Sequence, residues 1–137
     1  MNSEKKIILI ADADPYIQSL LEVVFPARDF EVTNISTGLE AGVYLKANTP
    51  DVAILDAELP TLDGIDLCGR IKRIRRLQDC VVIVLTATAD QRLADSARIA
   101  RADGVVVKPL AAQAFKTMVM DLLRRRSLVL VDDLERV

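Results

Sequence analysis

Two carboxylates, a hydroxyl and an ammonium each follow a short apolar run of this chain. Asp12 follows the run at residues 6–11, Asp56 that at 52–55, Thr86 that at 81–85 and Lys108 that at 105–107. A carboxylate can attack phosphorus in line, and a divalent cation, an ammonium and a hydroxyl stabilise the charge on the transferred oxygens. Two carboxylates on neighbouring strands can hold Mg²⁺, which prefers oxygen ligands. If the fold brings the four residues together, they suit transfer of a phosphoryl group to a carboxylate.

Neighbours of these residues have simpler structural explanations. Asp14 before Pro15 is typical of a helix N-cap followed by proline at the first helical position. Asp63-Gly64 is typical of the turn before a helix. The functional interpretation therefore depends on whether the secondary structure brings the four strand ends to one place.

Short apolar runs alternate with helical patterns five times along the chain. The runs are continuous and rich in valine and isoleucine, which is typical of a parallel sheet covered on both faces. They span residues 6–11, 30–35, 52–55, 81–85 and 105–107. Five βα units with right-handed crossovers predict an α/β fold, a flavodoxin-like doubly wound parallel sheet with strand order 2-1-3-4-5. The carboxyl ends of its strands lie at one edge, where we expect the four residues to share a shallow pocket.

Five helices are expected, one after each strand. Apolar residues at helical spacing mark the first helix at Ile17–Val24, the third around Leu67–Ile74 and the fifth around Phe115–Leu122. The second helix, near residues 37–46, contains two glycines, which weaken the prediction. The fourth, near 90–101, has the thinnest apolar stripe.

Length and composition favour one globular domain. The chain has 137 residues, of which 51% are hydrophobic, and its net charge of −2 does not favour nucleic acid or acidic membrane as a partner. No apolar run reaches the roughly 18 residues that a membrane span needs, and the start lacks a signal-peptide core. Cys68 and Cys80 have no metal-ligand spacing, so we expect reduced thiols in a cytoplasmic protein. Because the chain has no histidine, any phosphohistidine must come from another molecule.

Four segments in sequence order resemble the signatures of one family. They are IILIADADP, DVAILDAELPTLDGIDL, VVIVLTA and ADGVVVKPL. Together they resemble the CheY-like receiver domain of two-component response regulators, over residues 5–126. The strongest piece is the Asp-x-x-Leu-Pro-x-x-Asp-Gly pattern from Asp56 to Gly64, supported by Lys108-Pro109.

The resemblance implies a role for each of these residues. Asp56 is the expected phosphorylation site, Thr86 the switch hydroxyl and Lys108 the ammonium that pairs with the phosphate. The peptide bond before Pro109 is expected to be cis, as it is in the family. The implied partners are a histidine kinase or phosphotransfer protein, a downstream effector, and a second copy bound through the fourth helix, fifth strand and fifth helix.

The resemblance also implies a Mg²⁺ site, and here the sequence departs from the family. The expected ligands are Asp12, Asp56 and the backbone carbonyl of Glu58. The second member of the family's acidic pair is Ala13 in this chain, so we expect weak binding of Mg²⁺. Asp14 or the Glu58 side chain could substitute, although helix capping is the preferred role of Asp14.

A second departure is Val105, where the family usually has an aromatic ring that turns inward upon activation. Valine cannot report by burying a ring, so output would depend on shifts of the backbone or of a helix. Ala13 and Val105 together favour the main alternative, a pseudo-receiver that binds partners without phosphorylation. The intact Asp56, Thr86 and Lys108 oppose it.

A remote alternative is an aspartate-nucleophile phosphohydrolase of the haloacid-dehalogenase type. That interpretation assigns the motif residues to Asp12, Asp14, Thr86, Lys108, Asp132 and Asp133. It leaves Asp56 and the pattern that follows it unexplained. A flavodoxin-like nucleotide binder is disfavoured because the first βα turn is acidic and lacks glycine.

Residues 127–137 form a tail beyond the receiver-like segment. Its apolar run from Leu128 to Val131 predicts a strand, or a contact with a neighbouring chain, because exposed apolar side chains would be costly. The sequence does not tell whether the chain is complete or part of a longer regulator.

Overall fold

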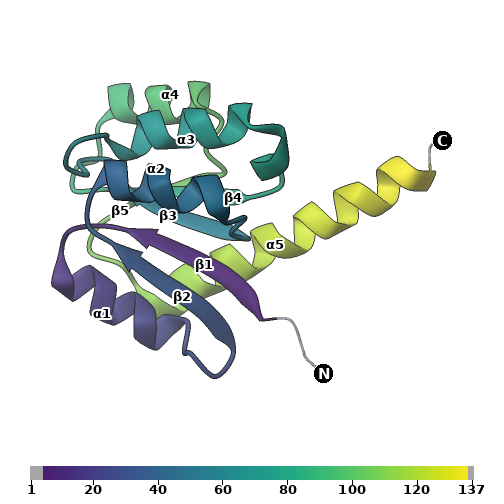
Figure 1. Cartoon of the computed structure of the whole chain (residues 1–137), viewed down its shortest axis with the longest axis horizontal. Helices are drawn as coiled ribbons and strands as arrows, with labels where there is room; N and C mark the ends of the chain where they lie inside the picture. The colour runs from purple at the N-terminus through teal and green to yellow at the C-terminus, as the bar shows by residue number, and fades with distance from the viewer. Residues whose placement is uncertain (1–4, 136–137) are drawn as a thin grey trace.

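A computed structural model describes residues 5–135 of the chain, and the side chains up to Arg126. Five parallel strands form one sheet in the order β2-β1-β3-β4-β5, as predicted (Figure 1). The strands are β1 (Lys6–Ala11), β2 (Phe30–Ile35), β3 (Val52–Asp56), β4 (Val81–Thr86) and β5 (Gly104–Val107). The helices are α1 (Pro15–Val24), α2 (Gly38–Ala47), α3 (Gly64–Arg73), α4 (Gln91–Ile99) and α5 (Ala112–Glu135), with a 3₁₀ turn, η1, at Arg75–Leu77. The flavodoxin-like α/β fold is therefore confirmed.

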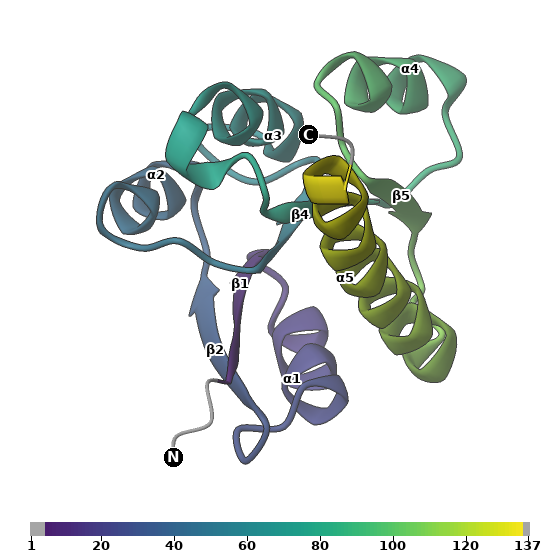
Figure 2. The same ribbon diagram turned by 90° about the vertical axis from the view of Figure 1, so that its right-hand side faces the viewer.

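The two faces of the sheet bury two separate apolar clusters because successive strand residues point to opposite sides. Leu9, Leu55 and Val84 lie on the face that packs against α2, α3 and α4. Ile10 and Ile54 lie on the other face, which packs against α1 and α5. Figure 2 shows α1 and α5 on one side of the sheet and α2 and α3 on the other. The central strands β1, β3 and β4 are thus buried on both faces, which holds their carboxyl ends rigidly.

Side-chain caps begin four of the helices. Asp14, Thr37, Asp63 and Asp90 each accept a hydrogen bond from a backbone N–H of the first turn. The capping role predicted for Asp14 is confirmed, with Pro15 at the first helical position. Thr37 explains why α2 forms in spite of its glycines, since its hydroxyl accepts from the Glu40 N–H and donates to the Glu40 carboxylate.

Gly38 is required by a close approach between α2 and the loop that follows β3. Its N–H donates to the carbonyl of Pro60 at 2.8 Å, and the N–H of Leu39 donates to the Thr61 hydroxyl at 3.0 Å. A Cβ atom on Gly38 would overlap the Leu62 carbonyl oxygen and lie 2.5 Å from Leu62 Cβ. The first turn of α2 is therefore packed directly on the loop between β3 and α3.

The strand predicted in the tail is wrong. The backbone of α5 remains helical to Glu135, because no glycine or proline interrupts residues 112–137. The last turns of α5 project beyond the other elements, as the yellow end of the chain in Figure 1 shows. Among the described residues, no helix is long and apolar enough to cross a membrane.

Arg126 marks the point at which α5 leaves the domain. Its guanidinium donates to the carbonyl oxygens of Asp51 and Asp79, at 3.4 and 3.0 Å, and lies 3.5 Å from the Asp51 carboxylate. Asp51 and Asp79 precede β3 and β4. Arg126 thus fastens α5 to the amino edge of the sheet, opposite the edge that carries Asp56.

Candidate functional site

Three of the four predicted side chains meet at the carboxyl edge of the sheet. Asp12 follows β1, Asp56 ends β3 and Lys108 follows β5. The Lys108 ammonium lies 2.9 Å from Asp12 Oδ2 and 3.6 Å from Asp56 Oδ2. Lys108 therefore bridges two carboxylates that come from adjacent strands.

Asp12 is fully buried and is held by the chain that follows it. Its Oδ1 accepts from the N–H of Asp14 at 2.9 Å, and its main-chain oxygen accepts from the Gln18 side chain at 2.7 Å. Its Oδ2 faces Lys108 as an ion pair but makes no hydrogen bond of good geometry with any described residue. Burial raises the pKa of Asp12, and the hydrogen bond from the Asp14 N–H and the contact with the Lys108 ammonium offset only part of this effect.

For Lys108, whose side chain is one-fifth exposed, the neighbouring charges together affect the pKa more than burial does. Burial lowers its pKa, but the close contact with Asp12 and the charges of Asp12 and Asp56 outweigh this effect, so that the pKa is raised overall. Lys108 is thus a fixed positive charge at neutral pH, placed between the two carboxylates.

Asp12→Asn is expected to stabilise the metal-free protein at neutral pH, because it removes a buried charge that lacks a full set of hydrogen bonds. Since the folded-state pKa of Asp12 is raised, folding takes up a proton above the ordinary aspartate value of about 3.9. The free energy of unfolding of the wild type therefore falls as pH rises through that window. The increase in the free energy of unfolding that Asp12→Asn brings should be largest near neutral pH and smaller in acid.

Thermal melts of Asp12→Asn at several pH values check this, with the exposed Asp29→Asn as the control. A lower melting temperature for Asp12→Asn at neutral pH would mean that attraction to Lys108 exceeds the cost of burial.

The Asp56 carboxylate lies at the mouth of the site. Its Oδ1 accepts from the N–H of Glu58 at 3.0 Å, and its side chain is 14% exposed. A Cβ atom on Gly64 would overlap the Asp56 carbonyl oxygen, so glycine allows α3 to begin directly beside the end of β3. Asp63 caps α3 through the N–H of Asp66. The Asp63-Gly64 pair therefore shapes the loop, and Asp56 presents an accessible oxygen next to Lys108.

Thr86 ends β4 but its hydroxyl is turned toward its own loop. The hydroxyl donates to the Thr88 carbonyl at 3.1 Å and accepts from the Thr88 N–H at 3.2 Å, and the side chain is buried. Among the described residues it makes no hydrogen bond with Asp56. The neighbouring Ala87 is exposed and small, so the space above Asp56 is not blocked from this side.

The oxygen atoms present fit a divalent cation with a reduced ligand set. The Asp12 and Asp56 carboxylates both face Lys108, and the incompletely bonded Asp12 Oδ2 is the kind of buried oxygen that a cation satisfies. No group of three acidic or thiol side chains that could hold a metal ion occurs in the described part of the chain. Ala13 is exposed and contributes no ligand, and Asp14 is occupied as a helix cap.

The other predicted features have mixed outcomes. The Lys108–Pro109 peptide bond is cis, as expected. Val105 lies on β5, in the strand that the sequence predicted, and is 37% exposed.

The phosphohydrolase interpretation fails on geometry, because positions 132 and 133 lie in the last turns of α5, beyond Arg126 at the opposite edge of the sheet.

Two contacts at this site are absent from the predictions. Gln18 holds the main chain of Asp12 from α1, and Thr61, at φ 71°, ties the loop after β3 to α2. Neither residue belongs to a pattern that the sequence reveals. Gln18 reaches back six residues to a main-chain oxygen, and the partner of Thr61 lies 22 residues away in the chain.

A comparison of the sequence with known protein families agrees with this arrangement of strand ends. Residues 8–120 match the response regulator receiver domain. The chain belongs to the receiver family. Receiver domains are signalling phosphoacceptors of two-component systems, and they partner with histidine kinases.

Known relatives agree with this assignment. The phosphate regulon transcriptional regulatory protein PhoB of Rhizobium meliloti (strain 1021) is 32% identical over 118 residues, which is 86% of this chain and 52% of that protein. The chain thus spans about half the length of the curated relatives it matches. A putative response regulator from Chloroflexus aurantiacus superposes with a TM-score of 0.82 at 29% identity, covering 88% of this chain and 99% of the other.

A third similarity concerns the fold alone. The receiver domain of the sensor histidine kinase PA1611 from Pseudomonas aeruginosa has a TM-score of 0.78 at 22% identity, covering 88% of this chain and 98% of its own. That protein carries a magnesium ion coordinated in its active site cleft.

Proposed function

We propose that this receiver accepts a phosphoryl group on Asp56 from a phosphohistidine of a kinase or phosphotransfer protein. The observation that carries the proposal is the bridge from Lys108 to both Asp12 and Asp56 at the carboxyl edge of the sheet. It places a positive charge beside the accessible Asp56 carboxylate, where the oxygens of an incoming phosphoryl group need it.

The chemistry is an in-line displacement. An Asp56 oxygen forms the new bond to phosphorus as the bond from phosphorus to the partner's imidazole nitrogen breaks and its electron pair stays on that nitrogen. Lys108 shifts its contact from the Asp56 carboxylate to a phosphoryl oxygen, and Thr86 exchanges its bonds to Thr88 for one to the same group. Mg²⁺, held by Asp12, Asp56 and the backbone carbonyl of Glu58, would supply charge neutralisation when bound.

The output of the switch is proposed to be a protein contact. Movement of Thr86 would release the loop at Thr88 and shift the backbone of β5, since Val105 has no ring to bury. Ile99 is 82% exposed, and Val105 and Val107 on β5 are also exposed. This face of α4, β5 and α5 is the expected site for an effector or for a second copy, in the cytoplasm and without direct contact to nucleic acid or membrane.

A second candidate function is a pseudo-receiver that is never phosphorylated. One observation favours it: Ala13 leaves the site with two carboxylates and no third acidic side chain in reach among the described residues. In that case the same exposed surfaces would bind partners constitutively.

Phosphorylation with a small phosphodonor distinguishes the two functions. With acetyl phosphate and Mg²⁺, intact-mass spectrometry should show a gain of one phosphoryl group that Asp56→Asn abolishes. Asp63→Asn, at the end of the loop that follows Asp56, should leave the gain intact because Asp63 only caps α3. No mass gain in the wild type at high Mg²⁺ would support the pseudo-receiver, and labelling that survives Asp56→Asn would move the acceptor elsewhere.

A further inference from the structure

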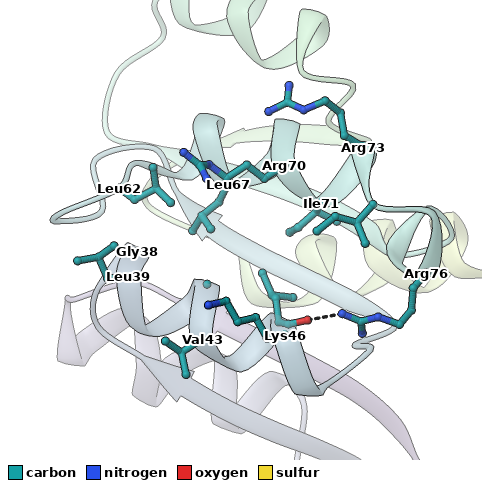
Figure 3. Close-up of a pocket in the computed structure, with 13 residues that line it drawn as sticks. Gly38, Leu39, Val43, Lys46, Leu62, Leu67, Arg70, Ile71, Arg73 and Arg76 are labelled. Carbon is teal, nitrogen blue, oxygen red and sulfur yellow. Dashed lines mark hydrogen bonds between the residues drawn. The ribbon is translucent and has the colours of Figure 1, made fainter.

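An apolar groove lies between α2 and α3, away from Asp56 and from the α4–β5–α5 face. It encloses about 730 Å³, and Leu39, Val43 and Ile74 line it. Figure 3 shows Leu39 and Val43 on α2 at this groove. These three side chains are 63%, 66% and 41% exposed. Apolar residues gathered in one groove, rather than scattered singly, indicate a surface for a partner.

The rim of the groove is basic. Lys46 from α2 and Arg70 and Arg73 from α3 line it, and none of the lining residues is acidic. Within the described part of the chain, neither Lys46 nor Arg70 has an ion-pair partner, in contrast to Lys72 and Arg126. Arg76 is different, because it bonds the Leu45 and Asn48 carbonyls at 2.7 and 3.1 Å and closes one end of the groove (Figure 3). The partner that fits is apolar with acidic flanks.

This chain itself carries a segment of that chemistry. Residues 127–135 are helical and project beyond the domain at the end of α5 (Figure 1). Helical spacing places Leu130, Val131 and Leu134 on one stripe, with Asp133 and Glu135 on its two sides. The segment is about 13 Å long, and the ten residues of α2 span about 15 Å. Length, apolar stripe and charge all match the groove.

We propose that residues 127–135 of one copy dock in the α2–α3 groove of a second copy. The contact is of the helix-in-groove type, with the apolar stripe on Leu39, Val43 and Ile74. Asp133 and Glu135 then face Lys46 and Arg70, which have no ion-pair partner among the residues with described side chains. The docking cannot be made within one chain, because Arg126 directs α5 away from the domain at the amino edge of the sheet.

A charge exchange in the full chain tests the proposal. The groove variant carries Lys46→Glu and Arg70→Glu, and the tail variant carries Asp133→Lys and Glu135→Lys. Each variant alone sets like charges against each other in both contacts of a symmetric dimer, so self-association should weaken about tenfold or more. An equimolar mixture restores opposite charges in both contacts, and should associate as a heterodimer as tightly as the wild type. Sedimentation velocity over a concentration series, with the two variants labelled differently, measures all of these.

The recovery in the mixture also shows that both variants are folded. Lys6→Glu with Arg28→Glu, at exposed positions outside the groove and outside the α4–β5–α5 face, is the control of equal charge change, and it should associate like the wild type. The proposal is overturned by a wild type that stays monomeric, or by a charge variant that self-associates as the wild type does. It is also overturned by a mixture of the groove and tail variants that does not recover, or by a control that dissociates as the groove and tail variants do. A wild type that is monomeric but captures an acidic helix from another protein would likewise assign the groove to that partner instead.

Discussion

Ala13→Asp is expected to tighten Mg²⁺ binding about ten- to thirty-fold and to speed phosphorylation of Asp56 by acetyl phosphate. Position 13 is exposed beside the buried Asp12, so a carboxylate there can reach the same cation without displacing a packed side chain. At an effective dielectric near 20, a carboxylate and a divalent ion a few ångströms apart attract by several kcal/mol. Removal of water from both ions offsets much of this, which leaves about 1–2 kcal/mol and hence that change in affinity.

Titration of Mg²⁺ against both proteins, followed by phosphorylation rates, measures the effect. Asp14→Asn is the matched control, because Asp14 is occupied as the cap of α1 and should not change the affinity for Mg²⁺. Equal affinities for the wild type and Ala13→Asp would mean that Glu58 or water already fills the place. If Ala13→Asp binds Mg²⁺ and still takes no phosphoryl group, the pseudo-receiver is the correct function.

Gly38→Ala is expected to destabilise the fold by about 3 kcal/mol, or roughly 10 °C in melting temperature. The added methyl group would overlap the carbonyl oxygen of Leu62, and backbone cannot move aside as the end of a flexible side chain can. Two hydrogen bonds tie the same turn to Pro60 and Thr61, so α2 and the loop would have to separate together.

Gly42→Ala, four residues along the same helix, is the control. A Cβ atom at Gly42 would meet nothing within 4 Å, so alanine should stabilise α2 by about 0.5–1 kcal/mol. Circular dichroism melts of the two variants therefore should move in opposite directions. A neutral Gly38→Ala would show that the loop after β3 yields easily and that its packing on α2 is loose.

The fold and the meeting of Asp12, Asp56 and Lys108 at one edge of the sheet were predictable because both depend on strong local patterns. Apolar runs that end in Asp12, Asp56, Thr86 and Lys108 require only that parallel strands present their carboxyl ends at one edge. The capping role of Asp14 was also predictable, since it depends on residues next to it in the chain.

Features that depend on distant parts of the chain were not predictable in the same way. Two glycines predicted a weak α2, but Gly38 is present because Leu62 approaches it from another loop. The apolar run at 128–131 predicted a strand, yet the residues before it are helical and nothing interrupts them, so α5 continues. The groove between α2 and α3 combines side chains from two helices, and no single stretch of sequence displays it.

The attachment of Arg126 gives α5 a fixed rotational phase. Residues beyond this anchor turn with the helix, so one residue inserted after Arg126 would rotate positions 127–135 by about 100° and advance them by about 1.5 Å. Insertion of seven residues would restore nearly the original orientation at a distance about 10 Å greater. The direction that each side of the projecting part of α5 faces, relative to the domain, therefore depends on the number of residues between it and Arg126.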